Sequence, residues 1–311
     1  MKLKGLLALL FIASVLQACG TGPAQTFLNE DKRNAIATVE LYNLVIQDEI
    51  LAEANVKHLD DSLTVKLFSG LLDSTIKTRS HVENQAIISP LYSEIEAWDY
   101  RGMVASPYND LVNKIFSLKN KEVSVEVVLL NQANLDSRVR ALKENEALLS
   151  LSHHYKFIED FKQIHTQTTA SLYVLPKKSL KYLDAPSEPI YRNTYNYQSN
   201  VVGSGGANSI ALWAASNAEL YKRKIKESIA NNTELMSYDL QVGNDESCAK
   251  NVYAYLYLPL LSMSSRNAHV IKSENGRLVL RTLDRELFYV EEDALDANQP
   301  GQPLNNNCVA K

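Results

Sequence analysis

The stretch HVIKSENGRLVLR, residues 269–281, decides how the C-terminal part of this chain folds. Two apolar runs flank Asn275 and Gly276, and both of these residues tolerate the positive φ angles of a two-residue turn. The stretch therefore predicts a β-hairpin. Residues 252–260 alternate between aliphatic side chains and tyrosines, and residues 286–290 are β-prone. We therefore expect a small antiparallel sheet in this region.

A strong helical pattern precedes this sheet. It covers residues 207–229, with an apolar content made up of Leu212, Trp213, Leu220, Ile225 and Ile229. The C-terminal part of the chain should therefore combine one helix with the antiparallel strands.

Apolar residues at helical spacing dominate the N-terminal half. Ala35, Val39 and Tyr42 predict a helix from about residue 29, and Ser-Pro pairs at 89–90 and 106–107 predict two further helix starts. The run at 122–130 fits either a strand or the start of a helix. Other helical faces are expected after a cap at 60–62 and within 134–165, namely Leu63, Leu67 and Leu71; Leu135, Val139 and Leu142; and Phe157, Phe161 and Ile164.

These patterns predict an α+β fold with two parts. A mainly helical domain would cover residues 29–167, and an α+β subdomain with a helix and a small antiparallel sheet would cover residues 168–311. The boundary is placed near Thr166, because residues 168–174 are β-prone and residues 175–198 are rich in proline and tyrosine with little helical periodicity.

The composition limits the possible partners. The chain has 311 residues, with 32 basic and 36 acidic side chains that are spread along its length. Nucleic-acid binding needs clustered Lys and Arg, so we expect no nucleic-acid partner. Sixteen tyrosines against seven phenylalanines favour partly hydrated surfaces, because tyrosine buries a ring and keeps a polar tip.

The N-terminus has the features of a secretory signal peptide. Lys2 and Lys4 provide a positive head, and an apolar run follows at residues 6–16. Such a run is too short to be a spanning helix. No later stretch is apolar for long enough to cross a bilayer.

The tetrad Leu16-Gln17-Ala18-Cys19 resembles the lipobox of bacterial lipoproteins. The resemblance implies that residues 1–18 are removed, and that Cys19 is acylated with chains such as palmitate and becomes the mature N-terminus of a tether over 19–28. Gly20 stands where an inner-membrane retention aspartate would be, so we expect an outer-membrane anchor facing the periplasm. The alternative is a plain signal peptide in which this cysteine has no role.

Cys248 and Cys308 remain once Cys19 is lipidated. In an oxidising compartment they are expected to form a disulfide that pins the C-terminal tail to the body. The alternative is a nucleophilic Cys248 with His269 as its base. Residues 269–271 are similar to the histidine strand of a family of cell-wall amidases, but Cys248 lies in Glu-Ser-Cys-Ala rather than Asp-Cys-Ser-Gly, and the two residues are 21 positions apart.

The glycine cluster Gly203, Gly205 and Gly206 precedes a predicted helix, where backbone amides can bind an anion. Its spacing matches neither dinucleotide nor P-loop motifs, and the alternative is a flexible turn. The histidines show no metal-binding spacing, and the acidic clusters single out no catalytic pair. We expect no cofactor and no metal.

Taken together, the sequence favours a membrane-anchored, non-enzymatic scaffold or assembly accessory that binds another envelope protein. An anchored periplasmic inhibitor or immunity protein against a toxin, and an envelope hydrolase using Cys248 and His269, are the alternatives. Tyrosines are enriched at interfaces. Tyr253, Tyr255 and Tyr257 could form an exposed interaction face, extended by Tyr191, Tyr195 and Tyr197. The alternative is an ordinary sheet whose tyrosines are covered by a helix.

Overall fold

The computed structural model describes residues 28, 30–45, 51–52, 83–116, 132–175, 188–242, 254–256, 266–282 and 285–291. The helix start expected at 60–62 and the ambiguous run at 122–130 lie outside these residues. Within them, no helix is both long and apolar enough to cross a membrane.

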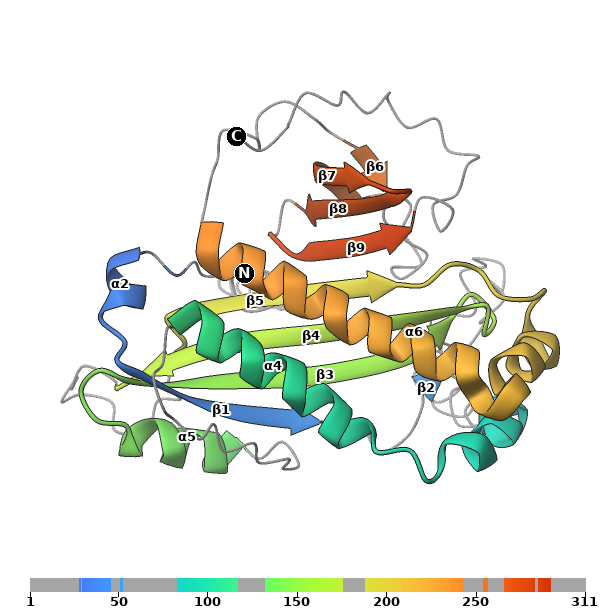
Figure 1. Ribbon diagram of the computed structural model, residues 1–311, viewed down its shortest axis with the longest axis horizontal. Coiled ribbons are helices and arrows are strands. Elements are labelled where there is room, and N and C mark those ends of the chain that lie inside the picture. The colour runs from blue at the N-terminus through green and yellow to red at the C-terminus, as the bar shows by residue number, and fades with distance from the viewer. Residues whose placement is uncertain are drawn as a thin grey trace, which may run out of the picture.

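A single mixed sheet forms the centre of the described structure (Figure 1). Its strand order is β1-β3-β4-β5-β9-β8-β7-β6, and β2 pairs with β3 beyond the end of β1. β1 and β2 run parallel to β3, and β5 runs parallel to β9, while the other neighbours are antiparallel. The strands are β1 (Thr38–Val45), β2 (Leu51–Ala52), β3 (Glu146–Ile158), β4 (Gln163–Val174), β5 (Tyr191–Gln198), β6 (Ala254–Leu256), β7 (Arg266–Glu274), β8 (Arg277–Thr282) and β9 (Leu287–Glu291).

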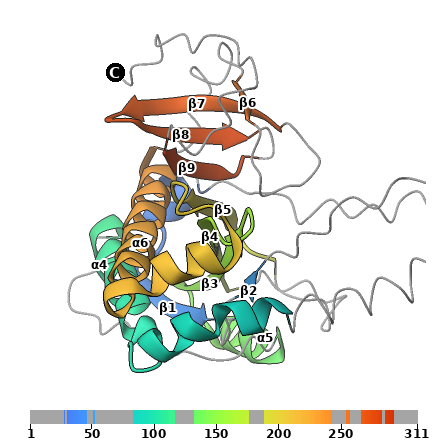
Figure 2. The same ribbon diagram turned by 90° about the vertical axis from the view of Figure 1, so that its right-hand side faces the viewer.

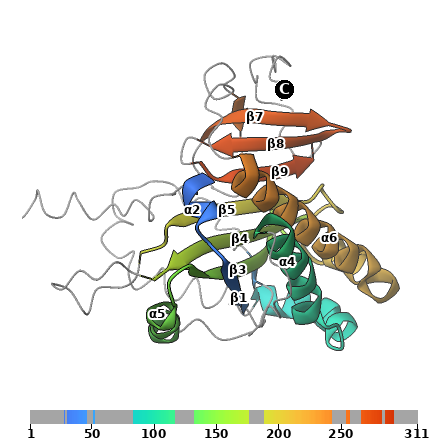
Figure 3. The ribbon, with the colours of Figure 1, turned by 60° about the vertical axis from the view of Figure 1, so that its left-hand side comes forward.

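Helices cover both faces of this sheet. α4 (Tyr100–Phe116) and the long α6 (Gly206–Val242) cross one face, and α5 (Gln132–Ala141) lies on the other (Figures 2 and 3). The short α2 (Glu30–Asn34) precedes β1, and residues 83–95 form a further helix before α4.

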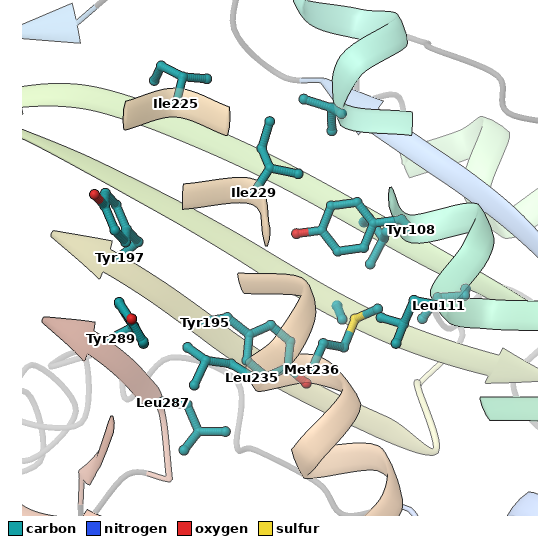
Figure 4. Close-up of a cluster of buried hydrophobic side chains, with 14 of the residues drawn as sticks. Tyr108, Leu111, Tyr195, Tyr197, Ile225, Ile229, Leu235, Met236, Leu287 and Tyr289 are labelled. Atoms are coloured by element: carbon teal, nitrogen blue, oxygen red, sulfur yellow. The ribbon is translucent and has the colours of Figure 1, made fainter. Parts of the chain in front are cut away.

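The main core lies between the sheet and the α4–α6 layer. Residues of β5, β9, α4 and α6 interlock there, including Tyr108, Tyr195, Ile229 and Leu287 (Figure 4). A smaller core on the opposite face packs α5 against the sheet through Tyr42, Leu135, Val139, Leu142, Leu148 and Tyr173.

The expectation of a mainly helical N-terminal domain is wrong. Residues 38–45 form β1, and Val39 and Leu41 face the main core while Tyr42 faces the smaller one. Val39 and Tyr42 lie on opposite faces of this strand and enter different cores, so their three-residue spacing matches a helical pattern by coincidence.

A coincidence of spacing also explains the error at 134–165. Leu135 and Val139 do lie on a helix, but α5 ends at Ala141, and β3 and β4 follow. Phe157 and Ile164 are close because β3 and β4 pair at these residues, not because they share a helical face. The expected small antiparallel sheet is also wrong, since β6–β9 continue the large sheet through the parallel β5–β9 contact.

Some local predictions are confirmed. β7 and β8 form the expected hairpin, with φ of 53° at Asn275 and 75° at Gly276. The helix expected from residue 207 begins at Gly206. The two Ser-Pro pairs do not start helices, because the helices begin at residue 83 and at Tyr100 and continue through both prolines.

Candidate functional site

Several residues singled out from the sequence lie outside the described parts of the chain. These are Cys19, Cys248, Cys308, Tyr253 and Tyr257. Tyr255 pairs with Asn267 between β6 and β7, and His269 pairs with Arg281 between β7 and β8. The lipidation, the disulfide, the thiol–histidine pair and the C-terminal tyrosine face therefore stay predictions.

Tyr191, Tyr195 and Tyr197 do not belong to an exposed face. All three are fully buried (0% exposed) on the side of β5 that α6 covers. The sequence could not separate this from exposure, because a tyrosine in a strand serves a helix-covered face as well as a hydrated one.

A buried carboxylate on the sheet-facing side of α6 explains how the hydroxyls of two of these tyrosines are satisfied in the core. Asp239 Oδ2 accepts hydrogen bonds from the Tyr191 hydroxyl at 2.6 Å and from Asn193 Nδ2 at 2.7 Å. Arg281 Nη2 lies 3.1 Å from Asp239 Oδ1, and the hydroxyls of Tyr191 and Tyr195 bond to each other. Burial is the main reason that the pKa values of Tyr191 and Tyr195 lie well above the usual 10.0, so both remain neutral. The cluster fixes α6 on β5 and β8.

A second buried cluster joins α4 and α6 to the sheet. Thr168 Oγ1 lies 3.1 Å from the Tyr108 hydroxyl and 3.1 Å from His153 Nδ1, and it accepts from Asn232 Nδ2 at 3.2 Å. Burial lowers the pKa of His153 to about 3, so the imidazole is neutral at physiological pH. Burial likewise lowers the pKa of His165 to about 3 on the opposite face of the sheet. In the described residues no cluster of His, Cys, Asp and Glu could hold a metal.

Three amides of the glycine loop, those of residues 204–206, donate within the chain. The Ser204 amide donates to Asn208 Oδ1 at 3.0 Å, and the Gly205 amide donates to Ser209 Oγ at 2.9 Å. The Gly206 amide donates to the carbonyl of Asp160 at 2.8 Å. An anion at this loop would have to displace these bonds. Anion binding at Gly203, Gly205 and Gly206 stays a prediction.

Three segments lie at the end of the sheet where β3 turns into β4, and we call them together the loop corner. They are the β3–β4 turn (residues 159–162), the glycine loop (201–206) and a break in α6 (215–218). Val202 donates its amide to Lys162 O, and Trp213 Nε1 donates to Phe161 O at 2.8 Å. Positive φ angles are concentrated in these segments, at Glu159, Asp160, Phe161, Gly203, Gly205, Gly206, Ser216, Asn217 and Ala218.

This backbone is unfavourable in itself. Each left-handed residue other than glycine costs about 1–2 kcal/mol, and the corner has two runs of three such residues. Gly205 has a φ of 109°, and a Cβ there would lie 2.4 Å from Asp160 Oδ2. Such conformations persist only where the surroundings enforce them, and they are frequent at functional sites.

A ladder of aromatic rings packs against the β3–β4 turn. Phe157 lies at its centre, with ring centroids 5.9 Å from Phe161, 5.9 Å from Trp213 and 6.1 Å from Tyr221. Aromatic pairs at such distances and tilts are favourable beyond the area that they bury. The ladder continues from Tyr221 through Trp98 and Tyr100 to Tyr155.

Two large apolar side chains project from the corner into solvent. Val201 is 53% exposed and Leu212 is 45% exposed. Leu212 Cδ1 lies 3.0 Å from the position that a Cβ on Gly203 would take, so it lies against the glycine loop. Among the described residues, the other large apolar side chain with comparable exposure is Leu175, at the end of β4. The corner and the adjoining first turns of α6 therefore carry two exposed apolar side chains.

Comparisons with protein-family models, with curated proteins and with solved structures find no match to this chain.

Proposed function

We propose that this chain is a lipid-anchored cell-envelope protein that binds another envelope protein through the loop corner. The anchor rests on residues 1–19, where a signal peptide ends in a lipobox-like tetrad at Cys19. The observation that carries the binding role is the exposure of Val201 in the glycine loop and of Leu212 in the first turns of α6, next to Trp213 of the aromatic ladder.

The physical reason is that a rigid apolar surface binds at low entropic cost. Loops that are already ordered lose little conformational freedom when a partner docks. Binding sites are also disproportionately carried by loops on a rigid scaffold. By contrast, the Asp239 and Thr168 clusters lie beneath helices and their polar groups bond to one another, so these clusters stabilise the fold.

Affinity capture from solubilised membranes tests this function. The bait is the mature lipoprotein, and the perturbed bait carries Val201→Asp and Leu212→Asp. Leu175→Asp is the matched control, because Leu175 is similarly exposed (42%) but lies at the end of β4, away from the turn that leads into that strand.

Burial of each apolar side chain contributes about 1.5–3 kcal/mol, so we expect the double substitution to reduce capture of the partner at least about tenfold. The control should capture it at the wild-type level. Equal capture by all three baits would show that the corner is not the binding surface. The identity of the captured protein distinguishes a scaffold from an inhibitor, because a toxin would indicate inhibition.

A further inference from the structure

The chain enters the described structure at the end opposite the loop corner. Leu28 is buried, and Arg33 of α2 donates from Nη1 to the carbonyl of Leu240 at 3.2 Å, at the C-terminal end of α6. The Ala37 amide then donates to Asn145 O, just before β3 begins. These contacts fix the entry end to the body.

The body is elongated between these two ends. α2 lies at one end of the long axis, and the β3–β4 turn and the start of α6 lie at the other (Figure 1). β3 runs along this axis for 13 residues, which corresponds to about 43 Å at the usual rise of a strand.

The tether is shorter than the body. If Cys19 carries the lipid, residues 19–27 separate the membrane from Leu28, and they reach at most about 30 Å when fully extended. The entry end therefore stays near the bilayer. Because the tether lets the entry end rise no more than about 30 Å, the corner can touch the bilayer only if the body lies flat on it or leans toward it.

Charge does not favour a flat orientation. Without residues 1–18 the chain has 30 basic and 36 acidic side chains, so an anionic lipid surface does not attract it. The β3–β4 turn has Glu159 and Asp160 against the single cation Lys162, whose Nζ lies 4.0 Å from Glu159 Oε2. The corner therefore has no cationic excess with which to bind lipid headgroups.

From these observations we propose that the body is a spacer that points the loop corner away from its own membrane. The occupant of the corner is then a protein outside the anchoring bilayer, and the Val201–Leu212 surface is not a lipid contact. This inference rests on the lipid anchor and the binding role given under the proposed function.

Energy transfer on vesicles tests the orientation without any partner. A fluorescent residue replaces Asp31 at the entry end or Leu212 at the corner, and the lipidated protein is inserted into phosphatidylcholine vesicles that contain an acceptor lipid. Transfer should be efficient from position 31 and several-fold weaker from position 212. Adding phosphatidylglycerol should not increase transfer from position 212.

Equal transfer from the two positions, or greater transfer from position 212, would overturn the spacer geometry. Failure of the orientation is separable from failure of the proposed function. If the corner lies on the lipid while capture still depends on Val201 and Leu212, the binding role stands and the orientation is wrong. If transfer follows the expected order while capture is indifferent to these residues, the orientation stands and the binding role is wrong.

Discussion

Replacing Arg281 with methionine isolates the contribution of the ion pair beneath α6. The substitution removes the guanidinium that lies 3.1 Å from Asp239 Oδ1, while the Asp239 side chain is 0% exposed and that of Arg281 only 15%. Water therefore cannot replace the lost partner. Breaking such a pair costs about 3–5 kcal/mol, and because Tyr191 and Asn193 still donate to Oδ2, we expect the lower end, about 3 kcal/mol.

Arg138→Met is the matched control, because Arg138 pairs with Glu40 at 2.6 Å but the two side chains are 32% and 37% exposed. An exposed pair of this kind contributes about 1 kcal/mol or less, and the contact of the Arg138 guanidinium with the Tyr42 ring adds about 0.5–1 kcal/mol, so the loss should stay below about 2 kcal/mol. Urea unfolding of the mature chain without its lipid gives both free energies, and the m-values should match that of wild type. A loss below about 1 kcal/mol for Arg281→Met, or equal losses for the two variants, would refute the stabilising role of the buried pair.

Two other predictions concern pH and the loop corner. The pKa of His153 and of His165 is about 3 in the folded chain, whereas a histidine ordinarily has a pKa of 6.5. Between these pH values the unfolded chain therefore binds more protons than the folded chain. The contribution of the neutral imidazoles to stability is complete above pH 6.5 and falls as the pH decreases. At pH 5 each histidine should lower the free energy of unfolding by about 2 kcal/mol, and His153→Gln should reduce the pH dependence of urea unfolding by that amount. A pH profile parallel to that of wild type would contradict a neutral buried imidazole at His153. Gly205→Ala should destabilise the fold by about 2–3 kcal/mol, because its φ of 109° strains any residue with a Cβ and the Asp160 carboxylate would also have to move. Gly276→Ala, which has a φ of 75° and no atom within 4 Å, should cost about 1 kcal/mol in thermal unfolding. Equal losses for the two glycine variants would show that the contact with Asp160 is not tight.

Local features of the fold could be predicted from the sequence, because their signals lie within a few residues. Asn275 and Gly276 both take positive φ angles, so the hairpin between β7 and β8 needed no long-range information. The start of α6 could be predicted in the same way. The break in α6 at Ser216 could not be predicted, because no glycine or proline marks the three consecutive left-handed residues there.

Features that depend on distant pairing could not be predicted. β1 and β3 each place an apolar side chain in the smaller core as well as several in the main core, so strict alternation does not identify them as strands along their whole length. Asp239 meets Tyr191 and Arg281 across more than 40 positions of sequence, and none of these residues belongs to a local motif. In the loop corner the glycines did predict a turn, but only the fold shows that Val201 and Leu212 lie exposed beside it.

Photo-crosslinking in intact cells is the most direct test of the loop corner as a binding surface. A photoreactive amino acid would replace Leu212 in one variant and Leu175 in a second, since both side chains are exposed to a similar degree, 45% and 42%. We predict one discrete protein adduct from position 212 and none of that mass from position 175. The same adduct from both positions, or no protein adduct from position 212, would contradict binding of a partner at the loop corner.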